Sequence, residues 1–126
     1  MVNTRVLEGR VAFVSGSSRG IGRSIAEHLA ALGASVIIHG STENSPGTFG
    51  GSLTLSELAG LISARTHSRA ASVCGDLRSP AGAEMIADTV KGLFGGIDIL
   101  VNCAGGDVGS KGIDPRTGGS PEGNDA

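Results

Sequence analysis

The segment Val11–Gly22 constrains the fold of this chain more than any other, because an apolar run there ends in a glycine-rich turn. Its first part, Val11–Ser15, has no polar alternation, which is typical of a parallel strand covered on both faces. Gly16, Gly20 and Gly22 lie where a backbone leaving a strand must turn sharply, leave room for an anion and pack a helix closely. The segment therefore predicts a strand, an anion-binding turn and the start of a helix whose positive end faces the anion.

Strand and helix patterns alternate along the chain as far as residue 105. Between the second expected strand and the second expected helix, residues 40–53 are polar and glycine-rich and predict a loop longer than most connections. Residues 54–57 have the Thr-x-x-Glu form of a capping box, and Ser79 before Pro80 is typical of a helix start. Met85 is among the apolar residues expected to face inward from that helix. The expected strands are residues 11–15, 36–38, 69–74 and 97–101, and the expected helices are residues 21–32, 55–65 and 80–94.

This order of elements predicts an α/β fold. A strand, a helix and a second strand within about 28 residues form a βαβ unit, whose strands are parallel and whose crossover is right-handed. Repetition of the unit builds the N-terminal half of a Rossmann-type doubly wound parallel sheet with strand order 3-2-1-4. Residues 1–105 are thus expected to form a dinucleotide-binding half-domain. Residues 106–126 are rich in glycine and proline without an apolar period, and we expect a flexible loop or tail there.

Charge and composition exclude several classes of function. The 126 residues carry 10 Lys and Arg against 12 Asp and Glu, and a net charge of −2 gives no basic surface for nucleic acid or an anionic membrane. The longest apolar runs are about five residues, far short of the roughly 20 needed to span a bilayer. We therefore expect a soluble, cytoplasmic protein. No Cys or His spacing predicts a metal site.

The cysteines Cys74 and Cys103 are expected to stay reduced. With the strand order above, the strands that carry them lie roughly 14 Å apart. A disulfide needs less than about 7 Å between the two Cα atoms.

Motifs at the ends of the expected strands resemble those of the short-chain dehydrogenase/reductase family. Residues 15–22, Ser-Gly-Ser-Ser-Arg-Gly-Ile-Gly, resemble its Thr-Gly-x-x-x-Gly-x-Gly cofactor motif, and residues 102–105, Asn-Cys-Ala-Gly, resemble its Asn-Asn-Ala-Gly turn. Asp76-Leu77 resembles the pair that the family places beside adenine. Ser15 and Cys103 depart from the family's Thr and Asn. The resemblance covers residues 8–106 approximately, and the pattern is most similar to 3-oxoacyl-carrier-protein reductases and related sugar and polyol dehydrogenases.

The resemblance implies a nicotinamide cofactor bound at the ends of the strands. Arg19 is either a guanidinium positioned for a 2′-phosphate, which its planar fork suits, or a solvated loop cation. Asp76, with Leu77 as an apolar wall, is either a partner of adenine or a helix cap. The residues implied at the cofactor are Gly16, Ser18, Arg19, Gly20, Ile21, Gly22, Ser41, Asp76, Leu77, Asn102, Ala104 and Gly105.

The end of the second strand bears on the choice of cofactor. NAD-binding proteins place an Asp or Glu there to accept from the ribose 2′-OH, and that carboxylate would repel a 2′-phosphate. Here His39, Gly40 and Ser41 occupy this position, and no acid occurs before Glu43. We therefore favour NADP(H), with Ser41 as a donor to the phosphate, while NAD(H) stays open. His39 is either packed at the strand end or a phosphate ligand.

No catalytic residue is predicted within this sequence. The resemblance places the family's catalytic Ser, its Tyr-x-x-x-Lys pair and a helix Asn in a further half, and the 126 residues contain no Tyr. We expect that half as a second chain or a missing segment, and a homo-oligomer of the complete oxidoreductase. The alternative is a non-catalytic nucleotide-binding subunit or sensor, and a weaker one is a decayed fragment.

Overall fold

The computed structural model describes residues 4–47 and 53–104. The predicted flexible segment 106–126 and Gly105 lie outside these residues. A short 3-10 helix, η1, within the predicted loop was not expected from the sequence. The elements are β1 (Val11–Ser15), α1 (Gly20–Ala31), β2 (Ser35–Gly40), η1 (Ser45–Gly47), α2 (Leu55–Thr66), β3 (Ala70–Cys74), α3 (Pro80–Gly92) and β4 (Ile99–Asn102).

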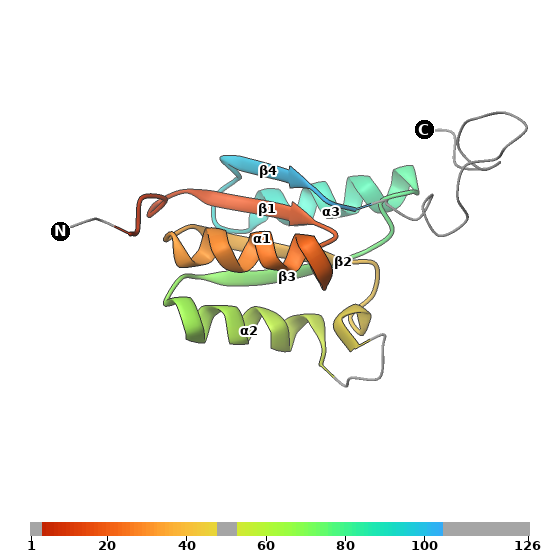
Figure 1. Cartoon of the computed structure of the whole chain (residues 1–126). Coiled ribbons are helices and arrows are strands. Elements are labelled where there is room, and N and C mark those ends of the chain that lie inside the picture. Colours follow the sequence, from red (N-terminus) through yellow and green to blue (C-terminus); the bar gives the residue numbers. More distant parts are fainter. Residues whose placement is uncertain (1–3, 48–52, 105–126) are drawn as a thin grey trace, which may run out of the picture.

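The strands form one parallel sheet in the order β3-β2-β1-β4, which confirms the predicted topology. β1 lies between β2 and β4, so that Val14 pairs with Ile38 on one side and with Val101 on the other. All the arrows in Figure 1 point the same way, and the four carboxyl ends meet at one edge of the sheet. This is the edge at which doubly wound folds bind ligands.

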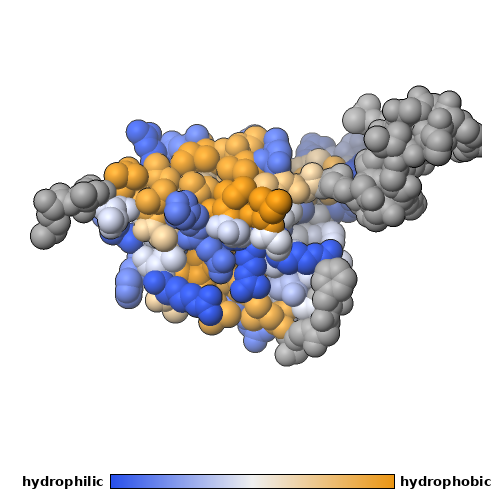
Figure 2. Space-filling model, in the orientation of Figure 1, coloured by the Kyte–Doolittle hydropathy of each residue, from blue (hydrophilic) through white to orange (hydrophobic). Residues whose placement is uncertain are grey.

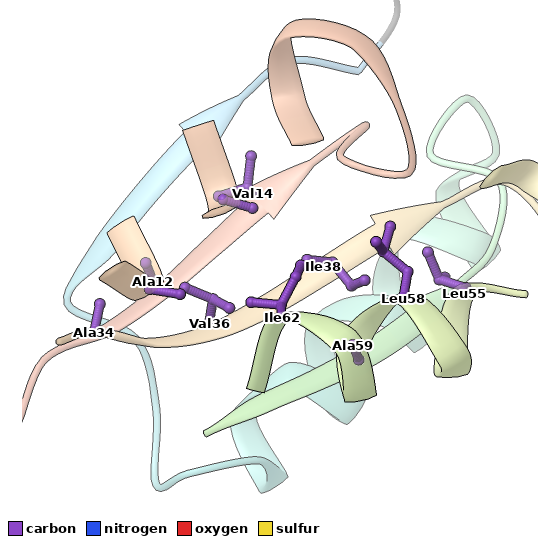
Figure 3. Packing of buried hydrophobic residues seen from close by; sticks show 11 residues of the cluster. Ala12, Val14, Ala34, Val36, Ile38, Leu55, Leu58, Ala59 and Ile62 are labelled. Atoms are coloured by element: carbon purple, nitrogen blue, oxygen red, sulfur yellow. The ribbon is translucent and has the colours of Figure 1, made fainter. Parts of the chain in front are cut away.

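Buried side chains alternate between the two faces of the sheet and make two apolar cores. On one face, residues of β1 and β2 pack against α1 and α2; these are Ala12, Val14, Val36 and Ile38. In the close-up, Leu58 and Ile62 of α2 point toward β2 (Figure 3). On the other face α3 covers the sheet (Figure 1). The core on that face consists of Val11, Phe13, Ile37, Val73, Ile86 and Val90.

The starts of α2 and α3 are fixed by the side chains that the sequence indicated. The hydroxyl of Thr54 accepts a hydrogen bond from the Glu57 N–H at 3.2 Å, and the Glu57 carboxylate accepts from the Thr54 N–H at 2.9 Å. This reciprocal pair confirms the capping box. At α3, the Ser79 hydroxyl accepts from the Gly82 N–H at 3.2 Å. Pro80 occupies the first helical position, where its missing N–H costs nothing.

The expectation for α3 was wrong in two respects. Met85 is 60% exposed rather than inward-facing, because only Ile86 and Val90 of this helix lie in the core. The helix also ends at Gly92 rather than at residue 94, since Leu93 is extended and Phe94 has a left-handed φ of 50°.

Within the described ranges, β4 is an edge strand that pairs only with β1. Its Leu100 is 56% exposed, and the preceding Ile97 is exposed as well. Figure 2 shows hydrophobic residues gathered on the upper part of the molecule, where Figure 1 places β1 and β4. An apolar edge strand of this kind is an aggregation liability unless another segment covers it.

Neither a membrane span nor a disulfide occurs in the part of the chain that the structure describes. None of its helices is both long enough and apolar enough to cross a bilayer. Cys74, the last residue of β3, and Cys103, which follows β4, are free thiols, and these two strands lie at opposite edges of the sheet.

Glu43 connects the segment after β2 to the start of α2. Its carboxylate accepts a hydrogen bond from the Ser56 N–H at 2.7 Å, and its carbonyl oxygen accepts from the Leu55 N–H at 2.7 Å. The Ser56 backbone N–H, followed by the Ser56 hydroxyl, lowers the pKa of the Glu43 carboxyl. Glu43 therefore acts as an additional acidic cap on α2.

We predict a pH-dependent loss of stability for Glu43→Gln. The pKa of Glu43 is lower in the folded than in the unfolded chain, so its ionised form favours folding above the unfolded value of about 4.3. That advantage disappears as the pH falls through the folded-state pKa. Urea unfolding at pH 7 should show the variant less stable by about 0.5 kcal/mol, and the gap should close at pH 3. Glu84→Gln, at an exposed position of α3, is the control; a gap of equal size at both pH values would contradict the prediction.

Candidate functional site

A groove of about 870 Å³ lies at the carboxyl edge of the sheet. Residues that end or follow all four strands contribute to its lining, as expected at the switch point between β1 and β4. The lining residues are Ser15, Gly16, Ser18, Arg19, Gly20, His39, Gly40, Ser41, Ser45, Gly75, Asp76, Leu77, Arg78, Asn102, Cys103 and Ala104.

Most residues that the sequence implied at a cofactor are brought together in this groove. Ile21 and Gly22 are not part of the lining: the Ile21 side chain is 78% exposed, and Gly22 is buried. Gly105 lies outside the described residues. The implied residues that do line the groove are Gly16, Ser18, Arg19, Gly20, Ser41, Asp76, Leu77, Asn102 and Ala104.

The floor of the groove is backbone packed against backbone. A Cβ atom at Gly16 would lie 2.7 Å from the Ala104 Cα and 2.9 Å from the Cys103 carbonyl carbon, so only glycine fits there. A Cβ atom at Gly22 would overlap the carbonyl oxygen of Gly16. Gly22 therefore acts from behind the groove, by letting α1 approach the turn closely.

Ser15 joins the two motif turns through its hydroxyl. The Oγ accepts hydrogen bonds from the Cys103 N–H at 3.1 Å and the Ala104 N–H at 3.3 Å. It lies 3.5 Å from the Val101 carbonyl oxygen, to which it donates. The sequence had indicated Ser15 only as a variant of the family's Thr. Its role in holding the turn after β4 appears once the parallel register places the two strand ends side by side.

The N-terminal end of α1 gives the groove positive potential. Arg19 is the N-cap residue, but its side chain makes no capping bond, and the first turn of α1 contains no acidic residue. The space beside Gly20 is open, because a Cβ atom placed there would meet no other part of the fold within 4 Å. Helix N–H groups and the helix dipole favour an anion at such an end.

Asp76 and Arg78 form an ion pair at the rim. The Asp76 Oδ1 accepts from the Arg78 backbone N–H at 2.9 Å and from its Nε at 3.1 Å, and Oδ2 accepts from the guanidinium at 3.3 Å. The Arg78 side chain, followed by its backbone N–H, lowers the pKa of Asp76. Sequence reasoning missed Arg78, although its position two residues after an Asp was a signal. With Arg19, the charged lining residues are two cations and one carboxylate.

The end of β2 is rich in hydroxyl groups. Ser45 on η1 is buried, and its Oγ accepts from the Thr42 N–H at 3.0 Å and lies 3.4 Å from the Ser41 Oγ. A Cβ atom at Gly40 would lie 2.9 Å from the Ser45 Cβ and 3.2 Å from the Ser18 Cβ. Ser45 was missed because the loop that carries it has no periodic pattern. No side chain larger than hydrogen fits at Gly40 without displacing these serines.

His39 is packed at the strand end. The side chain is 3% exposed, its Nδ1 accepts from the Gly16 N–H at 2.9 Å, and its Nε2 lies 2.9 Å from the Gly75 carbonyl oxygen. Both ring nitrogens are thus engaged with backbone, which agrees with packing rather than with a phosphate ligand. Within residues 4–47 and 53–104, no group of His, Cys, Asp or Glu side chains could hold a metal ion.

Comparison with known sequences agrees with this geometry. The family model for short chain dehydrogenases matches residues 10–117. Over 98 residues the chain is 39% identical to the 3-oxoacyl-[acyl-carrier-protein] reductase FabG of Escherichia coli, covering 78% of this chain and 35% of that protein. Over 106 residues it is 37% identical to a 2,3-dihydroxy-2,3-dihydro-p-cumate dehydrogenase of Pseudomonas putida, covering 84% of this chain and 38% of that protein. The chain thus spans little more than a third of the length of these relatives.

Comparison with solved structures gives the same result. L-Sorbose reductase from Gluconobacter frateurii, complexed with NADPH and L-sorbose, superposes with a TM-score of 0.69 at 33% identity, covering 81% of this chain and 35% of that one. The RhlG/NADP complex of Pseudomonas aeruginosa has a TM-score of 0.68 at 35% identity, covering 83% of this chain and 38% of that one. The strand order, the glycine turn packed on the turn after β4 and these matches agree, and the chain belongs to the short-chain dehydrogenase/reductase family.

Proposed function

We propose that this chain supplies the cofactor site of an NADP(H)-dependent oxidoreductase, which transfers hydride between the nicotinamide and a carbonyl or secondary alcohol. The observation that carries the proposal is the groove at the carboxyl edge, with Arg19 at the positive end of α1 and no acidic side chain on the end of β2. When bound, the nicotinamide accepts or supplies the hydride. The residues of this chain bind and orient the cofactor.

The residues present fit a dinucleotide. The open space at Gly20 lies beside helix N–H groups, where a diphosphate would be stabilised. The exposed backbone near Ala104 lets a ribose approach without a side chain in between. Leu77 offers an apolar wall for adenine beside the Asp76–Arg78 pair. These contacts need only the described residues of the groove.

The position of the acidic residues supports NADP(H) over NAD(H). Gly40 has no room for the Asp or Glu that would accept from a ribose 2′-OH. The next acid along the chain, Glu43, directs its carboxylate to the Ser56 N–H at the start of α2. Arg19 and the Ser41 hydroxyl both line the groove, and both can donate to a 2′-phosphate. The NADPH and NADP complexes of the two related proteins support the same choice.

We further propose that a second segment supplies the proton-transfer residues. The sequence has no Tyr, and the family resemblance assigns that role to a Ser and a Tyr-x-x-x-Lys pair. Such a segment, in the same or another polypeptide, would also cover the apolar edge at Leu100. We also propose that the complete enzyme is a homo-oligomer in the cytoplasm.

A second candidate is a non-catalytic nucleotide-binding subunit or sensor, which the groove at the carboxyl edge would serve equally well. Both candidates require cofactor affinity. They differ in turnover: the purified natural assembly should oxidise NADPH in the presence of a suitable carbonyl compound if the first is correct. Binding with no turnover over a broad panel of carbonyls and alcohols would support the second.

We predict that the chain binds NADPH at least 10-fold more tightly than NADH, and that Arg19→Ala removes most of the difference. Loss of a charge-assisted hydrogen bond to phosphate should weaken NADPH binding about 10- to 100-fold, with little effect on NADH. Isothermal titration calorimetry measures both. Arg23→Ala is the matched control, because Arg23 lies one turn further along α1, pairs with Glu27 and does not line the groove. A wild-type preference for NADH would refute the proposed cofactor.

We predict that Ser41→Asp reverses the preference while Ser41→Asn does not. The two substituted side chains have nearly the same shape, but only Asp places a negative charge beside the expected 2′-phosphate. NADPH affinity should fall by about 10-fold or more in the Asp variant, and NADH affinity should be retained or improved. Fluorescence titration of both cofactors checks this. Equal losses in the two variants would mean that Ser41 matters through its shape rather than through charge.

A further inference from the structure

We propose that His39 is a positioning residue of the groove. Its neutral imidazole joins the glycine turn after β1 to the turn after β3, and so sets the spacing of two walls between which the nucleotide binds. The consequence for binding rests on the proposed function, whereas the imidazole bridge itself rests on the geometry alone. The sequence offered packing or a phosphate ligand for His39, and neither describes this bridge.

Every polar group of His39 makes a hydrogen bond to the turn after β1 or to the turn after β3. Its N–H donates to the Ser17 hydroxyl at 2.9 Å, and its carbonyl oxygen accepts from the Ser17 N–H at 2.7 Å. The Ser17 hydroxyl in turn donates to the Val14 carbonyl oxygen at 2.7 Å. The imidazole then reaches the Gly16 N–H on one side and the Gly75 carbonyl oxygen on the other, each at 2.9 Å. Two turns that are separated in the sheet by β2 are thus joined through one side chain.

The hydrogen bonds of the ring select one tautomer. The Gly16 N–H is a donor, so Nδ1 must present its lone pair. In a neutral imidazole the proton is then on Nε2, which donates it to the Gly75 carbonyl oxygen. The side chain is buried, and with both nitrogens bonded the ring has little freedom to rotate. A second proton would set two donors, Nδ1–H and the Gly16 N–H, against each other.

The bridge has a functional consequence because of where its two ends lie. Gly16 begins the turn that leads to Arg19 and the positive end of α1, and Gly75 precedes Asp76 and Leu77. Both segments contribute residues to the groove lining. Without the imidazole, a partly buried N–H at Gly16 loses its partner and the two turns are no longer held at one spacing. Binding of the nucleotide would then carry the entropic cost of ordering them.

The proposal is tested with substitutions that keep or remove part of the bridge. His39→Leu removes both bonds, whereas His39→Asn keeps an acceptor near the place of Nδ1 for the Gly16 N–H. Phe13→Leu is the matched control, since it disturbs the neighbouring core without altering a hydrogen bond of the ring. We expect NADPH affinity of the whole chain to fall at least about 10-fold for His39→Leu and to recover partly in His39→Asn. Phe13→Leu should lower thermal stability and leave the affinity of the folded chain nearly unchanged.

Nitrogen-detected NMR of the histidine rings gives a readout that does not depend on cofactor. His39 should be a fixed Nε2–H tautomer with a bare Nδ1, while His28 and His67, both exposed, exchange between tautomers and serve as internal references. A His39 ring with the proton on Nδ1, or one that exchanges like the references, would overturn the bridge.

The outcomes separate this inference from the proposed function. If the wild-type chain binds neither NADPH nor NADH, the proposed function fails, and His39 loses its role as a positioning residue even where NMR finds the bridge. If the wild type binds NADPH and His39→Leu binds it equally well, or if His39→Asn recovers nothing, the positioning role fails while the proposed function stands. Should His39→Leu not fold, the His39→Asn titration and the wild-type NMR spectrum still decide.

Discussion

The contact between the ends of β1 and β4 is the constraint on which the rest of this structure depends. Gly16 touches the backbone of Cys103 and Ala104 with no side chain between them, and the Ser15 hydroxyl holds the same turn from the side. Any Cβ at Gly16 would separate the two strand ends. Because this contact closes the floor of the groove, the helix start, the turn after β3 and the end of β2 can all face one common space.

The fold could be predicted because its signals are local. The apolar strands and the capping box at Thr54 depend on residues close in sequence, and the parallel order follows from the handedness of βαβ units. Met85 shows the limit: it fits the helical pattern of α3 but is exposed, because the face of α3 that lies in the core carries Ile86 and Val90. The apolar pattern alone did not show that Met85 lies outside this face.

The candidate site was predictable to the extent that its residues stand in motifs. Glycines and the arginine of the first turn were found, whereas Ser45 lies in a loop without a periodic pattern and Arg78 was signalled only by its spacing from Asp76. His39 illustrates the reason. Its partners Gly16 and Gly75 lie 23 and 36 residues away, so the sequence left both packing and ligand binding open. Only the folded geometry, which uses both ring nitrogens, decides between them.

The charge of the groove likewise depends on contacts in space rather than on which residues are neighbours in the sequence. Glu43 is only a few residues from Ser41 in the sequence, but its carboxylate caps α2 and does not line the groove. Capping α2 therefore also keeps a negative charge from the end of β2, where Gly40 leaves no space for one. On the proposed function, a preference for a ribose with a 2′-phosphate would then depend in part on Glu43, because its carboxylate accepts from the Ser56 N–H at the start of α2 and does not face the groove. Under the same proposal, cofactor affinity would accordingly depend on the residues that line the groove, and among the charges near the end of β2 it would be the orientation of Glu43 that leaves room for a phosphate.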